Sequence, residues 1–302
     1  MPNKTKHFLY KLLSMLSVVR GYNVLVIAVA QYLNSIFILS EEQSGVEVIL
    51  DPSLFCLVAA SAITIASGYI INNFYDSEKD LINRPHKTRL DRLVSQQTKL
   101  TIYFILNFLA VIIASYTSFR AVLFFSIYIF LIWFYSHKLK KLLVIRNIAA
   151  TLLAIIPFFA VFIYYKNFDS VIFVHATFLL SILFMRELVK DLENMKGDIA
   201  VGNNTIPIAY GEKVTKRILS VMTVIALVTA MMLIYIFPLG KMHYYFWTSS
   251  VIILIFIILV NFSSRKRQYV LLHNLLKFTI VLGVFSILLI KPNAIRFLME
   301  LF

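Results

Sequence analysis

Long apolar stretches alternate with short polar ones along almost the whole chain. A helix that crosses a membrane needs about 20 mostly apolar residues, and nine stretches come close to this requirement. They lie at about residues 21–40, 53–74, 100–118, 121–136, 143–165, 169–187, 217–238, 244–262 and 274–290. The pattern predicts an all-α, polytopic membrane protein with nine transmembrane helices in a single bundle. We expect residues 1–302 to form one membrane-embedded domain, with Pro292–Phe302 as an interfacial tail.

The composition favours a membrane protein over a soluble one. Hydrophobic residues make up 60% of the chain and charged residues 15%, whereas soluble domains carry roughly 25% charged residues. The single cysteine, Cys56, lies in an apolar stretch and cannot form an internal disulfide. No cleavable signal peptide is expected, because no short apolar core with a small-residue cleavage site follows the basic start. The net charge of +14 fits loops beside anionic lipid better than a nucleic-acid partner.

The distribution of Lys and Arg between the predicted spans indicates the orientation of the chain. Cytoplasmic loops of membrane proteins carry an excess of these residues. If the N-terminus is cytoplasmic, 24 of the 29 Lys and Arg residues lie on the cytoplasmic side. The others are Arg120, Lys166, Lys241, Lys291 and Arg296. We therefore predict an integral protein of the cell inner or plasma membrane, with the N-terminus cytoplasmic and the C-terminus outside.

An acidic motif, here called motif one, begins where the second span meets water. Asn72, Asp76 and Asp80 recur every four residues, so that a continuing helix would place them on one face. Oxygen ligands of this kind suit a hard divalent cation such as Mg²⁺. The alternative is a solvated helix end whose acids pair with Lys79 and Arg84, although an amide at the membrane edge needs a partner.

A second acidic motif, here called motif two, follows the sixth span. Glu187, Asp191 and Asp198 lie at i, i+4 and i+11, close to one helical face. Gly197 is expected to end the helix before the last of them. Glu193 points elsewhere on a helix, and we expect it to form a salt bridge or to support the site from outside. The alternative is an ordinary charged helix end whose acids pair with neighbouring lysines.

The two motifs open long polar segments, residues 76–99 and 186–216, which we expect to be two cytoplasmic Asp-rich loops. One such motif binds a metal ion loosely, but two brought face to face in a bundle could hold several Mg²⁺ ions bridged by a diphosphate. Carboxylates alone would repel a diphosphate, and Mg²⁺ inverts the charge of the site. Lys and Arg complete the neutralisation, and fixed cations stabilise a leaving group as a C–O bond breaks.

These motifs resemble those of the UbiA superfamily of intramembrane prenyltransferases. Motif one matches the family's signature of Asn and two Asp at four-residue spacing, and Asn83-Arg84-Pro85 continues it as in the family. Tyr135-Ser136-x₂-Leu139-Lys140 is similar to a further family stretch. Motif two, with Gly202-x₂-Thr205-x-Pro207 after it, resembles the branch that contains digeranylgeranylglyceryl phosphate synthases. The chain departs from the family at Asn194, where an acid is common, and at Arg20-Gly21-Tyr22-Asn23 near the first span.

The resemblance implies Mg²⁺-dependent transfer of an isoprenyl group from an isoprenyl diphosphate to a lipophilic acceptor in membrane lipid. A (geranylgeranyl)glyceryl-phosphate-type lipid precursor is the favoured acceptor. The alternative is an aromatic quinone precursor of the 4-hydroxybenzoate or dihydroxynaphthoate type. A cation-coupled transporter is a more distant alternative, since its acids would lie deep in the spans rather than at their ends.

The residues expected to carry this chemistry form three sets. The predicted metal ligands are the oxygen-bearing residues of both motifs, Asn72, Asp76, Asp80, Glu187, Asp191 and Asp198. The predicted catalytic residues are the four aspartates among them, Asp76, Asp80, Asp191 and Asp198. The predicted diphosphate-binding residues are basic, namely Arg84, Lys87, Lys138, Lys140 and Lys190.

Overall fold

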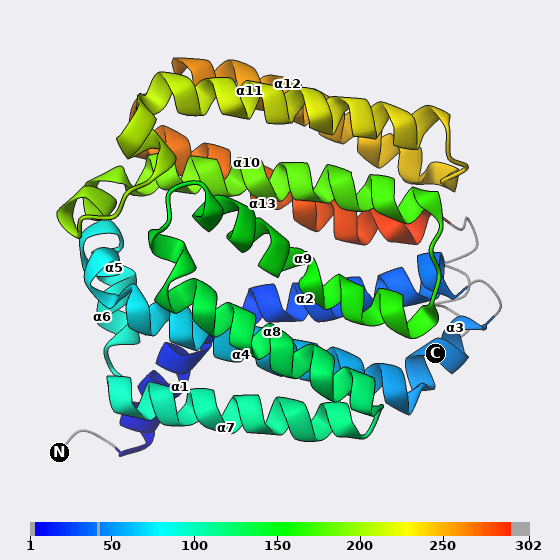
Figure 1. Cartoon of the computed structure of the whole chain (residues 1–302), viewed down its shortest axis with the longest axis horizontal. Helices are drawn as coiled ribbons and strands as arrows, with labels where there is room; N and C mark the ends of the chain where they lie inside the picture. Colours follow the sequence, from blue (N-terminus) through cyan, green and yellow to red (C-terminus); the bar gives the residue numbers. More distant parts are fainter. Residues whose placement is uncertain (1–3, 41–42, 291–302) are drawn as a thin grey trace. The chain divides into compact units, whose positions relative to one another are not determined.

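The chain is mainly helical in the part that the computed structural model describes, residues 4–40 and 43–290. No β-strand occurs in these ranges, which confirms the all-α prediction. The predicted interfacial tail, Pro292–Phe302, lies outside the described residues. The α-helices, labelled in Figure 1, are α1 (Lys4–Val19), α2 (Gly21–Asn34), α3 (Gly45–Leu50), α4 (Pro52–Tyr75), α5 (Ser77–Asn83), α6 (Pro85–Asp91), α7 (Gln96–Ser115), α8 (Phe119–His137), α9 (Ile145–Tyr165), α10 (Ser170–Ala200), α11 (Ile206–Tyr235), α12 (His243–Phe262) and α13 (Lys266–Ser286).

Nine helical stretches among the described residues are long and apolar enough to cross a membrane. They are Gly21–Leu39, Pro52–Tyr75, Gln96–Ser115, Phe119–Lys141, Ile145–Tyr165, Ser170–Ala200, Ile206–Tyr235, Gly240–Phe262 and Lys266–Leu289. The nine predicted spans are thereby confirmed. The largest differences concern α10, whose polar end remains helical over a total length of 31 residues, and α11, which begins at Ile206 and is kinked at Gly211 (φ 80°, ψ 165°).

The two predicted polar loops are largely helical, which corrects that part of the prediction. The first segment contains α5, α6 and the start of α7. The side chain of Ser95 caps α7 by accepting a 3.1 Å hydrogen bond from the backbone N–H of Thr98. The second segment is taken up by the end of α10 and the start of α11, which leaves only residues 201–205 between them. A base and an acid at four-residue spacing, such as Lys87 and Asp91, add a small amount to the stability of such a helix.

The described residues divide into two compact units, and each is described by itself. Unit 1 comprises the described parts of Met1–Ala28, Pro52–Lys141 and Lys196–Asn203. Unit 2 comprises those of Val29–Asp51, Leu142–Met195 and Asn204–Phe302. The prediction of one functional domain over the whole chain stays a prediction.

Unit 1 is organised around α4, which carries motif one at its end. This helix packs along α7 and α8, and α1 lies against both α4 and α6 (Figure 1). Gly68 permits the close approach of α4 to α8, since a Cβ at this position would lie 3.1 Å from the side chain of Ile132. The helix is therefore held on several sides up to the point where motif one begins.

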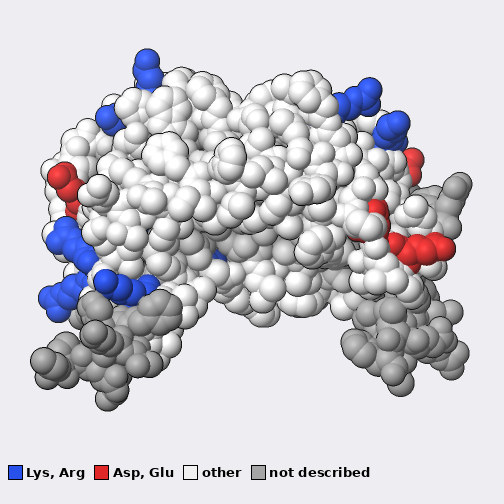
Figure 2. Space-filling model, turned by 90° about the horizontal axis from the view of Figure 1, so that it is seen from below, with Lys and Arg blue, Asp and Glu red and all other residues white. Residues whose placement is uncertain are grey.

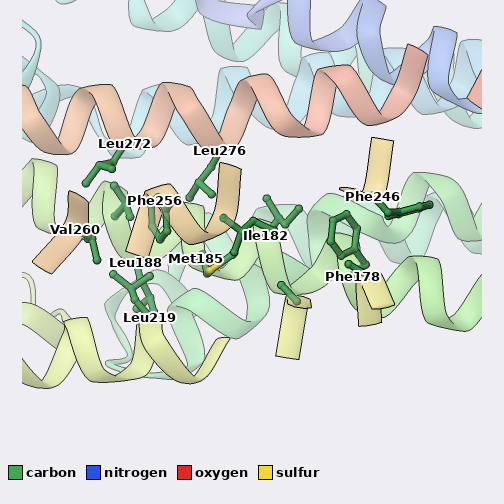
Figure 3. Close-up of a cluster of buried hydrophobic side chains, with 14 of the residues drawn as sticks. Phe178, Ile182, Met185, Leu188, Leu219, Phe246, Phe256, Val260, Leu272 and Leu276 are labelled. Atoms are coloured by element: carbon green, nitrogen blue, oxygen red, sulfur yellow. The ribbon is translucent and has the colours of Figure 1, made fainter. Parts of the chain in front are cut away.

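Unit 2 is organised around a core of side chains from α10, α11, α12 and α13. Figure 3 shows Phe178, Ile182, Met185 and Leu188 of α10 lying among side chains of the other three helices. The rings of Phe178 and Phe246 meet edge to face, with their centroids 5.4 Å apart. This packing fixes the helix on which the acids of motif two lie.

Charged side chains are concentrated at the ends of the surface that Figure 2 presents. Lys, Arg, Asp and Glu gather at its two ends, and the broad surface between them consists almost entirely of other residues. Charged groups in hydrocarbon are costly, so this separation is the one expected if the apolar helical stretches cross a lipid bilayer.

Candidate active site

Motif one lies at a break between two helices rather than on one continuous helix. Helix α4 ends at Tyr75, and Asp76 has φ −93° and ψ 4°, after which α5 begins. The backbone N–H of Asp76 still donates to the carbonyl of Asn72 at 3.0 Å, and that of Asp80 to the carbonyl of Asp76 at 2.8 Å. The expected uninterrupted helix is thus corrected, but the four-residue hydrogen-bond register continues through the motif.

Lys140 is the basic partner of motif one. It lies in the short 3₁₀ turn Leu139–Lys141 that follows α8. Its Nζ donates to Oδ1 of Asn72 at 2.6 Å and forms an ion pair with Asp76. The similarity between Tyr135–Lys140 and a family stretch therefore corresponds to a direct contact with motif one.

Asp80 differs from the other acids of the two motifs. Its side chain is half-buried, and within the described residues its carboxylate has no hydrogen-bond or ion-pair partner. A carboxylate in such a place is well suited to accept a cation from outside the protein.

The other basic residues predicted near motif one have different surroundings. Lys87 pairs with Asp91 at 2.6 Å, one helical turn away. Arg84 is half-buried at the junction of α5 and α6, and Lys138 is exposed beyond the end of α8. Arg84 and Lys138 are thus closer to solvent than Asp91 is.

Asp91 is the centre of a buried polar network. Besides Lys87, it accepts hydrogen bonds from Ser17 Oγ at 2.9 Å and from Asn73 Nδ2 at 3.1 Å. The amide oxygen of Asn73 in turn accepts from Lys99 Nζ at 2.9 Å. Asp91 and Lys99 are only 2% and 1% exposed. This network joins α1, α4, α6 and α7 beside motif one, and the sequence interpretation did not identify it.

Motif two lies on α10, which continues through Gly197 to Ala200. The predicted end of the helix at this glycine is therefore corrected. Glu187 is paired with Lys190 at 2.8 Å, with Arg186 3.6 Å away. Glu193 Oε2 lies 3.3 Å from Nδ1 of His273 on α13, a contact that is an ion pair only when this histidine is protonated, so that the salt bridge expected for Glu193 stays a prediction.

Asp191 is the most enclosed acid of unit 2. It is 1% exposed and accepts hydrogen bonds from Arg146 at 2.7 Å and from Asn147 at 2.8 Å. Both partners come from the first turn of α9. The sequence interpretation counted Arg146 only as a loop charge, because no local spacing links it to a residue 45 positions away.

Asp198, the last acid of motif two, belongs to unit 1, whereas Glu187 and Asp191 belong to unit 2. It is fully buried and pairs with Lys79 of α5 at 2.6 Å. The amide of Asn203 donates to the same carboxylate at 2.9 Å. The alternative interpretation of motif one paired Lys79 with its own acids, whereas the structure pairs it with an acid of motif two.

The acids of both motifs provide the oxygen ligands that Mg²⁺ prefers. Four of these five acids already have a basic side chain beside them, namely Asp76, Glu187, Asp191 and Asp198. No group of three or more His, Cys, Asp or Glu side chains among the described residues is placed to hold a metal ion. The ligand chemistry fits Mg²⁺, with Asp80 as the acid that has no protein cation among these residues. In the arrangement described here, lysine and arginine supply most of the neutralising charge.

Comparison with known proteins identifies the family. A family model described as the UbiA prenyltransferase family matches residues 43–279. The chain belongs to the UbiA prenyltransferase family. This confirms the resemblance that the motifs predicted, and it brings the two acidic motifs and Lys140 within the region shared by the family.

The curated relatives include several proteins named digeranylgeranylglyceryl phosphate synthase. The one from Thermococcus sibiricus is 33% identical over 163 residues, which cover 53% of this chain and 58% of the relative. The one from Methanobrevibacter smithii is 26% identical over 208 residues, which cover 65% of this chain and 71% of the relative. The aligned part of the chain thus spans little more than half the length of the first relative.

Solved structures show the UbiA fold. A structure concerned with digeranylgeranylglyceryl phosphate synthase in membranes matches with a TM-score of 0.69 and 20% identity, covering 95% of this chain and 99% of that one. A UbiA homologue from Archaeoglobus fulgidus bound to GPP and Mg²⁺ matches with a TM-score of 0.66 and 14% identity, covering 91% and 99%. The family and the apolar helices together make this chain an integral, multi-pass membrane protein.

The contact between Arg146 and Asp191 gives a prediction for stability. Replacing Arg146 by Met leaves a buried carboxylate without its cation, which costs about 3 to 5 kcal/mol. We expect Arg146→Met to lower the midpoint of thermal unfolding in detergent, and Arg146→Met combined with Asp191→Asn to recover part of the loss. The exposed Arg217 provides the control, since Arg217→Met should change the midpoint little. Equal midpoints for Arg146→Met and Arg217→Met would contradict the role of the pair.

Proposed function

We propose that this protein is a Mg²⁺-dependent prenyltransferase that transfers an isoprenyl group from an isoprenyl diphosphate to a lipophilic acceptor. The observation that carries the proposal is the match of residues 43–279 to the UbiA prenyltransferase family, with both acidic motifs inside the matched region. The contact of Lys140 with Asn72 and Asp76 supports it, because a diphosphate site needs both metal ligands and a phosphate-binding cation.

The favoured acceptor is a (geranylgeranyl)glyceryl-phosphate-type lipid precursor. The support comes from the curated relatives named digeranylgeranylglyceryl phosphate synthase and from motif two, which resembles that branch. The aromatic quinone precursor remains the alternative acceptor, and the assay below includes it. An isoprenyl diphosphate is the donor in either case.

The side chains of the two motifs have distinct proposed tasks. Asn72, Asp76 and Asp80 from motif one, with Glu187, Asp191 and Asp198 from motif two, are the proposed ligand set, in which the four aspartates are essential for the reaction. Mg²⁺ bound by such oxygens would neutralise the diphosphate and the charge that it gains as the C–O bond breaks. Asp198 is the most enclosed member of this set.

The basic side chains are proposed to hold the phosphate oxygens. Lys140 and Lys190 each lie beside an acid of a motif, so that either ammonium can pass from a carboxylate to a phosphate when a cation takes over that carboxylate. Arg84 and Lys138 lie nearer to solvent and would meet the diphosphate as it enters. Lys87, which pairs with Asp91, completes the proposed set.

One assay tests the function directly. Purified protein in detergent is incubated with Mg²⁺ and labelled isoprenyl diphosphates of different lengths, each with glyceryl-phosphate acceptors and with aromatic acceptors, and the products are identified by mass. We expect transfer from geranylgeranyl diphosphate to the glyceryl-phosphate acceptor. Excess EDTA should stop the reaction and added Mg²⁺ should restore it. Transfer to an aromatic acceptor alone would replace the favoured acceptor, and the absence of any transfer would reject the proposal.

Substitutions in the two motifs separate a catalytic role from a structural one. Asp76→Ala or Asp191→Ala should each lower kcat/KM by about 1000-fold or more, because the charge of the leaving diphosphate is no longer neutralised. Glu78→Ala provides the control, since Glu78 is an exposed acid on α5 between Asp76 and Asp80. Rates are measured on protein that elutes from gel filtration as the wild type does. Full activity of either motif variant would contradict the proposed site.

We also propose that the protein lies in the cell inner or plasma membrane, with the N-terminus and both motifs on the cytoplasmic side and the C-terminus outside. The bias of Lys and Arg supports this orientation. In a Cys56→Ser background, Arg89→Cys should be protected from a membrane-impermeant maleimide in intact cells, whereas Asp169→Cys should react. Both positions are exposed and lie in loops or helices outside the apolar stretches. The opposite labelling pattern would invert the orientation.

A further inference from the structure

Helix α10 has a second polar face besides the one that carries Asp191. Arg186, Lys190 and Glu193 follow one another at i, i+4 and i+7, so that on a helix they project within about 60° of each other. Asp191 projects about 100° from Lys190 and accepts its hydrogen bonds from α9. The face with Arg186 is turned towards α13, since Glu193 lies 3.3 Å from Nδ1 of His273. The two faces of α10 therefore meet different helices.

Arg186 is a poorly paired guanidinium within unit 2. Its Nε is buried and has no hydrogen-bond partner among the described residues, and its Nη2 reaches Glu187 Oε1 only at 3.6 Å. A guanidinium has five N–H donors, and buried donors that stay unpaired cost free energy. Glu187 also pairs with Lys190 at 2.8 Å and belongs to the proposed ligand set. Its carboxylate therefore cannot satisfy Arg186 as well.

His273 provides a second nitrogen atom in the same situation. Its Nδ1 is buried without a hydrogen-bond partner among the described residues, although Glu193 Oε2 is 3.3 Å away. Arg186 and His273 both lie within electrostatic range of Glu187. Side chains of α10 and α13 share the core of unit 2, which holds the two helices together beside these bases (Figure 3). Two helices thereby bring buried nitrogen atoms without hydrogen bonds close to one carboxylate.

The ligand that fits this cluster is a small oxyanion with several acceptor atoms. A phosphate monoester has three acceptor oxygens and carries nearly two negative charges at neutral pH. A guanidinium can bind two of these oxygens side by side, and an imidazole N–H can donate to the third. A glyceryl phosphate also carries its free hydroxyl within a few bonds of the phosphate. With the phosphate on the α13 side of α10, the hydroxyl would be near the side that bears Asp191.

We propose that Arg186, with His273 beside it, binds the phosphate of a glyceryl-phosphate-type acceptor. Arg186 is then the residue that distinguishes a phosphorylated acceptor from the corresponding uncharged alcohol. The diphosphate of the donor is held by the two motifs and by the basic residues named for it under the proposed function. The proposal rests on that function for its effect on transfer, whereas binding of the acceptor can be measured without Mg²⁺, without donor and without turnover.

The first test measures ligand binding by thermal unfolding in detergent with EDTA. The probes are a geranylgeranylglyceryl phosphate, the corresponding geranylgeranylglycerol and inorganic phosphate. The wild type should be half-saturated at a concentration of the lipid phosphate about tenfold or more below that of either other probe. Arg186→Gln should raise the half-saturating concentration of the lipid phosphate about 10- to 100-fold, because a charge-assisted hydrogen bond is lost, and leave that of the alcohol unchanged. Arg267→Gln, the same change at an exposed position of α13, is the control and should match the wild type.

The second test separates the acceptor from the donor in the transfer assay. Arg186→Gln should raise KM for the glyceryl-phosphate acceptor by the same factor and change KM for the isoprenyl diphosphate by less than about twofold. His273→Ala should raise KM for the acceptor about threefold to tenfold, and Asn274→Ala, at the exposed position next to it, should have no effect. Arg186→Lys keeps the charge beside Glu187 but loses the paired donors, so that it should give an intermediate rise with an unchanged thermal midpoint.

Other results would overturn the proposal. A wild type that does not prefer the lipid phosphate to both other probes would reject the site. Equal losses for the phosphate and the alcohol in Arg186→Gln would give Arg186 only a structural role, and a rise in KM for the donor alone would assign it to the diphosphate. If Arg186→Gln does not fold, Arg186→Lys decides, and unchanged binding of the lipid phosphate would reject the proposal. A wild type that transfers no isoprenyl group but binds the lipid phosphate through Arg186 would reject the proposed function and leave this site intact.

Discussion

The neutralisation of buried carboxylates is the constraint on which the arrangement at the polar ends of the helices depends. An isolated charge away from water costs several kcal/mol, so that each enclosed acid needs a cation close by. Asp191 has Arg146, Asp198 has Lys79 and Asp91 has Lys87. Each of these pairs joins two turns or two helices, and the charge balance thereby also fixes how the helices pack.

The fold could be predicted from the sequence to a large extent, because hydrocarbon imposes a simple rule. Backbone groups in lipid must be satisfied within the helix, so that an apolar stretch of sufficient length has essentially one solution. This rule located all nine apolar stretches that the described residues contain. It failed at the polar ends, where α5, α6 and the last turns of α10 continue as helices, because water and ion pairs can satisfy either a loop or a helix there. The rule also gave no prediction for helix α1, because its apolar part, Leu9–Val19, is too short to cross a membrane.

The candidate site was predictable in its residue types but not in its partners. The four-residue spacing of Asn72, Asp76 and Asp80 and the basic residue at position 140 could be found from local patterns. The partners Arg146 and Lys79 could not, since they come from segments 45 and 119 positions away from the acids that they neutralise. A lysine in a charged segment has no sequence feature that tells a phosphate-binding residue from a buried counter-ion. Only the tertiary structure distinguishes the two.

The consecutive residues Asn72 and Asn73 show how one helix turn serves two purposes. Successive side chains of a helix project about 100° apart, so that Asn72 reaches Lys140 whereas Asn73 lies between Lys99 and Asp91. The task of Asn73 requires an amide, because its oxygen must face the ammonium and its nitrogen the carboxylate. An isosteric aspartate would turn the second contact into a repulsion. A strict requirement for asparagine at position 73 would therefore reflect the polarity of a hydrogen-bond relay, and it would be mistaken to interpret it as a sign of contact with substrate.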